Sequence, residues 1–309
     1  MLLVRNIRLP LSCPDPDAEA AAQALHILRV PAHKAARCGV AKLSVDARHG
    51  KPVLVYTMAI TLKDEGEESA YAGASPCVCF TQPARFSFSV GDTALKTRPV
   101  VVGLGPAGLF AALLLARSGF RPLVLERGPE LDERVKAVEH FEKTGELNLN
   151  ANIQFGEGGA GTFSDGKLTT RVGDPLCAFV TDAFLQHGAP ADIAWRQKPH
   201  VGTDLLRGII RSIRQEIIAL GGEVRFNTAL TGLKIENGAL ASVETTAGDF
   251  ACEQLILAVG HSARDTFAML HRQGMPLECK PFSVGFRAEH LQTEIDKSLY
   301  HAAAGHPVL

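Results

Sequence analysis

The stretch VVVGLGPAGLFAALLLARSG, residues 100–119, decides the fold. Three valines form a short apolar strand, a glycine loop follows, and the loop opens a helix rich in alanine and leucine. The loop has the spacing Gly103-x-Gly105-x-x-Gly108, which is typical of dinucleotide-binding β-α-β units. Gly103 permits the tight turn, Gly105 lets a pyrophosphate approach the backbone, and Gly108 lets the helix pack closely on the strand.

The surroundings of the loop strengthen this prediction. The helix begins at Pro106 and Ala107, and its N-terminus offers free N–H groups and a partial positive charge to phosphates. A second apolar strand over residues 122–125 is followed by Glu126, 23 residues after Gly103. That distance is close to the ~20 residues expected for the carboxylate that binds the ribose hydroxyls. Because a carboxylate repels a 2′-phosphate, we expect FAD or NAD and not NADP.

Later segments predict further contacts with the cofactor. The apolar run LILAVG, residues 255–260, ends in Gly260 and resembles the strand that passes close to the cofactor in two-dinucleotide-binding flavoproteins. A predicted helix over residues 204–220, a glycine turn and a short strand precede this run. In FAD domains of the glutathione-reductase type, the same pattern puts the backbone near Leu230 against adenine.

A glycine-rich segment, FGEGGAGTFSDG, covers residues 155–166. So much glycine leaves a backbone that can wrap a planar or phosphorylated ligand. We expect it to cover the FAD pyrophosphate or to lie over the isoalloxazine ring; a surface loop without a ligand is the other interpretation. The positive charge of the lysine that follows would favour a reduced anionic flavin. The candidate cofactor contacts here are Gly159, Gly161, Thr162, Ser164 and Lys167.

Arg127 and Arg134 follow the acidic residue, and we expect either of them to reach adenine or a phosphate, with Arg127 the stronger candidate. His200 and His261 are acid/base candidates because histidine titrates near neutral pH. A histidine that follows a strand is more often a structural hydrogen-bonding partner, so we assign no catalytic residue. No cluster of Cys and His has the spacing of a zinc site, and we expect no metal.

The composition is that of an ordinary soluble globular protein, with 46% hydrophobic and 21% charged residues among 309. A net charge of -1 argues against a general nucleic-acid binder. Seven scattered cysteines argue against a disulfide framework. No apolar stretch is long enough to span a bilayer, and the N-terminus lacks a signal-peptide pattern. We therefore expect a cytoplasmic protein without nucleic-acid or membrane partners, acting with a small-molecule substrate or an electron donor such as NAD(P)H.

The alternation of elements predicts an α/β fold. We expect a Rossmann-type, three-layer FAD/NAD(P)-binding domain over residues 98–270, preceded by a small α+β, ferredoxin-like domain over residues 1–92. The first domain reads β-α-β-β from its strand and helix patterns. Residues 271–309 are expected to begin an incomplete substrate or cap domain.

Three segments, residues 152–168, 198–204 and 260–266, resemble the uncharacterised FAD-dependent dehydrogenases of bacteria. The resemblance covers nearly the whole chain. It implies a glutathione-reductase-type fold, FAD as cofactor and oxidoreductase activity on a substrate that it does not identify. Members of that family continue well beyond this length, with a glycine-rich motif for the flavin side of the cofactor, so we expect a truncated chain.

Two other interpretations stay open. In the first, the glycine loop binds NAD and the protein is an NAD-dependent dehydrogenase; the glycine-rich segment and the run 255–260 argue against it. In the second, the protein is a non-catalytic dinucleotide-binding sensor or assembly module. The absence of an evident acid/base residue keeps the second open, because this architecture hosts many activities.

Overall fold

The computed structural model describes residues 1–309 except His49, 83–85, Ser164, Asp165, Thr169, Arg171, Gly173 and Arg287. The chain divides into two compact units. The first comprises Met1–Arg85, Asp192–Pro199 and Pro281–Leu309, and the second comprises Phe86–Ala191 and His200–Lys280. Among the described residues, no helix has both the length and the apolar character needed to cross a membrane.

The first unit is built on an antiparallel sheet of order β2-β3-β1-β4. Its elements are β1 (Leu2–Pro10), α1 (Pro16–Leu28), η1 (Ala32–Lys34), β2 (Ala35–Asp46), β3 (Val53–Leu62), η2 (Glu65–Tyr71) and β4 (Val78–Phe80). The 3-10 segment η2 stands where a β-α-β-β-α-β unit has its second helix. The described elements of residues 1–80 therefore follow the order β-α-β-β-β, with one α-helix in this part of the unit.

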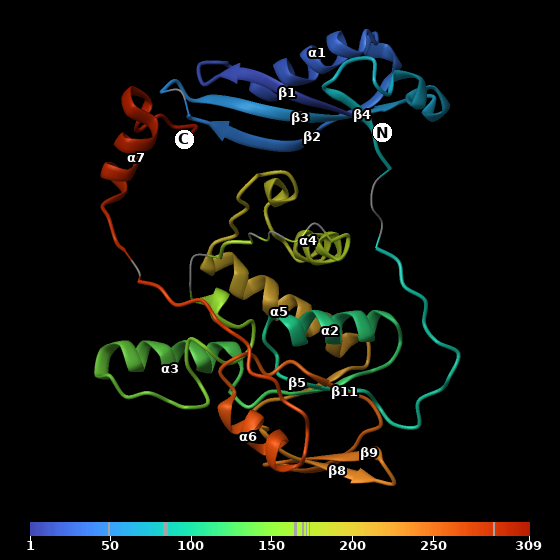
Figure 1. Cartoon of the computed structure of the whole chain (residues 1–309), viewed down its shortest axis with the longest axis vertical. Helices are drawn as coiled ribbons and strands as arrows, with labels where there is room; N and C mark the ends of the chain where they lie inside the picture. Colours follow the sequence, from blue (N-terminus) through green and yellow to red (C-terminus); the bar gives the residue numbers. More distant parts are fainter. Residues whose placement is uncertain are drawn as a thin grey trace. The chain divides into compact units, whose positions relative to one another are not determined.

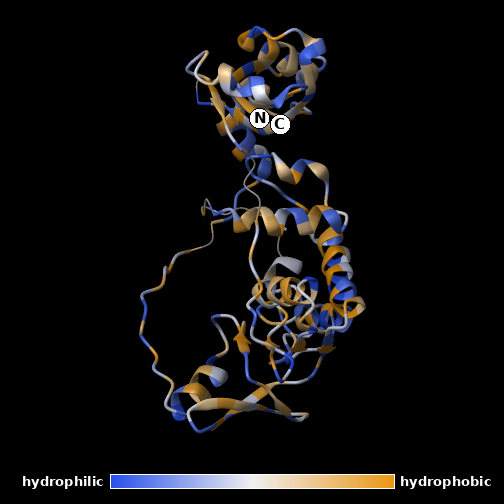
Figure 2. Cartoon of the chain, turned by 90° about the vertical axis from the view of Figure 1, so that its right-hand side faces the viewer, coloured by the Kyte–Doolittle hydropathy of each residue, from blue (hydrophilic) through white to orange (hydrophobic). Residues whose placement is uncertain are grey.

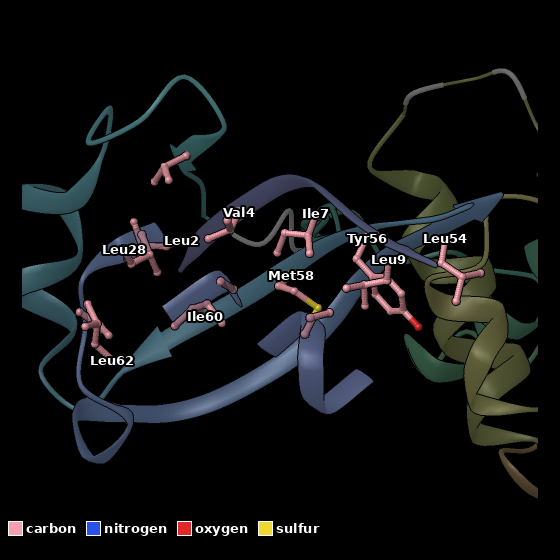
Figure 3. Packing of buried hydrophobic residues seen from close by; sticks show 14 residues of the cluster. Leu2, Val4, Ile7, Leu9, Leu28, Leu54, Tyr56, Met58, Ile60 and Leu62 are labelled. Carbon is pink, nitrogen blue, oxygen red and sulfur yellow. The ribbon is translucent and has the colours of Figure 1, made fainter. Parts of the chain in front are cut away.

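The core of this unit lies between the sheet and α1, as Figure 3 shows for the side chains of β1, β3 and Leu28. Along β3 every second residue is buried, because alternate side chains of a strand point to the same face. The helix begins after Asp15, whose side chain accepts the N–H of Ala18 at 3.0 Å. That capping bond satisfies one of the free N–H groups at the helix start.

Later parts of the chain also belong to the first unit. The backbone N–H of Leu43 donates to the carbonyl of Trp195 at 2.9 Å, and that of Gln197 donates to the carbonyl of Leu43 at 3.0 Å. Residues Asp192–Pro199 thus extend the edge of the sheet at β2. The remaining elements here are η4 (Ala191–Ala194), α7 (Gln292–Tyr300) and η5 (His301–Ala303). The predicted substrate or cap domain over 271–309 stays a prediction.

The second unit contains a parallel sheet of order β11-β5-β6-β7, which confirms the prediction of a mixed α/β chain with a parallel sheet. The strands are β5 (Val100–Val102), β6 (Leu123–Leu125), β7 (Glu223–Arg225) and β11 (Leu255–Leu257). An antiparallel sheet adds β8 (Leu230–Glu236), β9 (Ala239–Thr245) and β10 (Gly248–Ala251). The helices are α2 (Pro106–Arg117), α3 (Leu131–Thr144), α4 (Leu176–Gln186), α5 (Thr203–Ala219) and α6 (Arg264–Arg272), and η3 (Ala160–Thr162) is a 3-10 turn.

These elements form layers on either side of the parallel sheet. Helices α2 and α5 lie on one side, and β8, β9 and α6 lie on the other (Figure 1). Val100 and Val102 pack with Leu230 and Val243 in one core cluster, because alternate residues of β5 face the antiparallel sheet.

Helix α5 is amphipathic, and its apolar face explains its place in the fold. Its buried residues are Leu206, Ile209, Ile210, Ile213 and Ile217. This spacing puts them on one face of the helix, while the charged residues take the other face. Figure 2 shows both hydrophobic and hydrophilic residues along the helices.

The packing of the first unit predicts that Ile60→Ala lowers the free energy of unfolding by about 2–5 kcal/mol, because the substitution leaves a cavity at a side chain with 0% exposure. Trp195, the chain's one tryptophan, reports on this unit by its fluorescence during urea denaturation. Val45→Ala, at a side chain that is 40% exposed, is the control and is expected to change stability by no more than about 0.5 kcal/mol. Equal shifts of the two midpoints would contradict this packing.

Candidate functional site

A cavity of about 480 Å³, called here the first cavity, opens at the carboxyl ends of β5, β6 and β11. Ligands of open α/β sheets bind at this edge. Nine of the residues predicted to contact a cofactor line the first cavity: Gly103, Gly105, Pro106, Ala107, Glu126, Arg127, Gly159, Leu230 and Gly260. The structure thus brings together residues from distant parts of the sequence.

The three glycines of the loop differ in what surrounds them. Gly103 has a φ of +99°, and an added Cβ would overlap the carbonyl of Ala258. A Cβ on Gly108 would overlap the carbonyl oxygen of Gly103, because α2 packs directly against the strand end. Gly105 has an ordinary φ of -66°, and a Cβ there would meet nothing within 4 Å. The fold therefore requires Gly103 and Gly108, whereas Gly105 keeps space open beside the cavity.

The N-terminus of α2 faces the same cavity through Pro106 and Ala107. Gly105 is its N-cap residue and provides no side-chain hydrogen bond. The first N–H groups of a helix have no partner within the helix, and the helix dipole puts partial positive charge there. This end of α2 can therefore hold a phosphate group.

Glu126 closes the cavity at the end of β6 and is only 3% exposed. Its carboxylate accepts the backbone N–H of Leu104 at 2.7 Å and that of Gly128 at 2.9 Å. It therefore ties the glycine loop to the chain that follows β6. Each carboxylate oxygen has two lone pairs, so ribose hydroxyls can still donate to it. The sequence indicated the ribose contact but not the bond that fixes the loop.

Arg127 lines the first cavity and a polar cavity of about 760 Å³ beside it. Its guanidinium forms an ion pair with Asp265 at 2.7 Å and lies 5.5 Å from the ring centre of Phe155. Both partners fix the direction of the side chain. The polar cavity continues past Arg127 to Ala229 and Thr246.

Arg134 is fully buried and holds the glycine-rich segment in place. Its N–H groups donate to the carbonyls of Asn152 (3.0 Å), Ile153 (3.1 Å), Glu157 (2.6 Å) and Gly159 (3.0 Å) and to the hydroxyl of Thr162 (3.1 Å). Burial lowers the pKa of Arg134 to about 10. We expected this side chain to contact adenine or a phosphate. Its described hydrogen bonds go instead to the glycine-rich segment and to the residues just before it.

The glycine-rich segment passes against the start of α2. Gly159 has a φ of +71°, and an added Cβ would come within 2.6 Å of the Pro106 side chain. Thr162 has 0% exposure, and its hydroxyl donates to the carbonyl of Gly159 at 2.8 Å, so it stabilises the segment from inside. Gly161 and Lys167 line a different cavity, on the side of α4. The predicted contact at Ser164 lies outside the described residues.

Of the two histidines considered, His261 lines the first cavity, whereas His200 pairs with Lys167 in a β-bridge. Phe155, Thr228 and Thr266 also line the first cavity and were not identified from the sequence. Phe155 comes from the start of the glycine-rich segment, Thr228 from the loop before β8 and Thr266 from α6, and only the tertiary fold brings them together. Within the described ranges, no three His, Cys, Asp or Glu side chains gather as a metal site.

Comparison with known proteins finds similarity in sequence to a longer protein. An uncharacterised protein of Clostridium beijerinckii is 51% identical over 223 residues, which cover 72% of this chain and 42% of the relative. The chain therefore spans less than half the length of that relative. No protein-family model matches the chain.

Similarities to solved structures are distant. Glycine oxidase from Bacillus cereus is 13% identical with a TM-score of 0.37, over 58% of this chain and 60% of that chain. L-Amino acid deaminase from Proteus myxofaciens is 15% identical with a TM-score of 0.32, over 62% and 51%. The atypical thioredoxin reductase of Desulfovibrio vulgaris is 23% identical with a TM-score of 0.30, over 54% and 37%.

The contacts of Arg134 predict that Arg134→Lys lowers the free energy of unfolding by about 3 kcal/mol or more, because an ammonium cannot reach acceptors spread around a planar guanidinium and leaves several of them unpaired. Arg211→Lys is the matched control. Arg211 pairs with Asp132 at the surface, so its replacement should change stability by no more than about 0.5 kcal/mol. Chemical denaturation measures both; similar losses would mean that Arg134 does not organise the segment.

Proposed function

We propose that the chain is the FAD-binding part of a flavin-dependent oxidoreductase, with FAD in the first cavity. One observation carries this proposal: Gly105 leaves open space at the uncapped N-terminus of α2, in the same cavity as the carboxylate of Glu126. A phosphate-binding helix end and a ribose-binding carboxylate are the two parts that a dinucleotide site needs.

The residues present fit FAD along its length. The N–H groups at the start of α2, from Ala107 and Gly108, would bind the pyrophosphate, and Glu126 would accept the ribose hydroxyls. The adenine would lie toward Leu230 and the polar cavity, beside Arg127. Gly159 and Gly260 would let the backbone approach the cofactor from two sides.

FAD, when bound, supplies the electron-transfer chemistry, and the protein binds, orients and shields it. Arg134 acts here as a positioning residue, because its bonds keep Gly159 against the first cavity. His261 lies at the wall of the first cavity, where its imidazole would be within reach of a bound ligand. An electron donor such as NAD(P)H or a small-molecule substrate would complete the reaction.

The resemblance to bacterial FAD-dependent dehydrogenases supports the same proposal. It covers nearly the whole chain and rests on the segments 152–168, 198–204 and 260–266. The matched relative is much longer than this chain. The proposal therefore includes the activity of the whole protein and its substrate domain. It also includes the ferredoxin-like character of the first unit.

Gly105→Ala tests the cofactor site without disturbing the fold. The new methyl group meets no protein atom within 4 Å, so thermal stability should stay unchanged, whereas the pyrophosphate loses its close approach. We expect the affinity for FAD to fall by roughly tenfold or more in an equilibrium titration. Gly208→Ala, where an added Cβ also meets nothing, is the control that keeps wild-type affinity.

The same titrations separate the alternatives. Tight binding of NAD together with no binding of FAD would replace the proposal with an NAD-dependent dehydrogenase. Binding of FAD that no chemical or nicotinamide donor reduces would favour the sensor or assembly module. Unchanged FAD affinity in Gly105→Ala would place the cofactor elsewhere.

A further inference from the structure

A second cavity, of about 530 Å³, adjoins the first and is called here the apolar cavity. Pro106 and Ala107 line both cavities. Gly159 lines the first of them only, whereas Gly158 and Gly161 line only the apolar one. The glycine-rich segment therefore runs between two cavities at the start of α2.

Three helices on one side of the parallel sheet supply most of the apolar wall (Figure 1). The contributing side chains are Leu109 and Phe110 of α2, Val180 and Phe184 of α4, and Leu206 and Ile210 of α5. Phe110 and Phe184 meet edge to face with ring centres 5.4 Å apart, which fixes two of these walls. Such a volume with hydrophobic walls is typical of a small-molecule site, and apolar cavities bind apolar compounds.

The polar groups of this cavity indicate the chemical class of its ligand. Lys167, Thr170 and Thr181 line it, and among the described residues no Asp or Glu does. A lysine ammonium carries three N–H donors, so a ligand can share it with a protein partner. Among the residues that the structure describes, Lys167 is the charged side chain of this apolar wall, and its ammonium can donate to the carboxylate of a ligand with a hydrophobic body.

We propose that the apolar cavity binds a hydrophobic carboxylate, with an aromatic or branched aliphatic body between α2, α4 and α5 and the carboxylate toward Lys167. Its role as the substrate rests on the proposed function, because the cavity adjoins the helix end assigned to the FAD pyrophosphate. The binding itself does not depend on FAD.

Calorimetric titration with phenylbutyrate, and with phenylbutanol as its uncharged analogue, tests the proposal on the purified chain with and without added FAD. Phenylbutyrate is expected to bind once per chain. Val180→Phe fills the cavity and should weaken binding by roughly tenfold or more, whereas Ile218→Phe, at an exposed position of α5, should leave it unchanged. Thr181→Met is a second, gentler filling variant. Lys167→Met should weaken phenylbutyrate and not phenylbutanol.

The contrary results distinguish a failure of the ligand site from a failure of the proposed function. No binding of phenylbutyrate, or equal affinity in Val180→Phe, Thr181→Met and Ile218→Phe, would overturn the inference. So would filling variants that weaken FAD instead of phenylbutyrate, because the cavity would then hold the flavin. Phenylbutyrate binding that responds to these variants in a chain unable to bind FAD would support the ligand site and overturn only the proposed function.

Discussion

The burial of Arg134 is the constraint on which the candidate site depends. A guanidinium taken out of water destabilises a protein unless its donors are paired, and here the hydrogen bonds of Arg134 reach carbonyls from Asn152 to Gly159. The guanidinium also lies over the ring of Phe163, within the same segment, 4.7 Å from the ring centre. Gly156, with a φ of +114°, must be glycine because a Cβ would overlap the Arg134 side chain. These contacts fix the conformation of the glycine-rich segment, which has little regular secondary structure.

The glycine-rich segment separates two different cavities at the start of α2. On one side, the carboxylate of Glu126 and the open space at Gly105 form the site that we propose for a dinucleotide. On the other, the helices present an apolar surface that ends at Lys167. Buried Glu157 links the glycine-rich segment to α3 and α5, because it accepts the N–H of Leu131 at 2.9 Å and pairs with Arg214 at 2.8 Å. A cofactor and a second ligand could therefore meet at one helix end without sharing a cavity.

The sequence predicts those features that depend on local pattern. The valine strand, the glycine loop and the following helix need only neighbouring residues, and the parallel sheet follows from them. The predicted strand over 255–260 is shorter in the structure, ending at Leu257, because the chain there turns along the first cavity. No periodic pattern in the sequence indicates the role of Arg134, the packing of Asp192–Pro199 on the first sheet or the apolar cavity. The residues that form these features come from loops or from separate helices. Such contacts become visible only in the folded chain.

The most direct test of the account is the visible absorbance of the chain after it has been mixed with FAD and separated from unbound flavin by gel filtration. The account predicts that flavin absorbance elutes with the protein at one FAD per chain, because the first cavity contains a helix end for the pyrophosphate and a carboxylate for the ribose. A colourless protein peak, with all flavin in the small-molecule fraction, would contradict it.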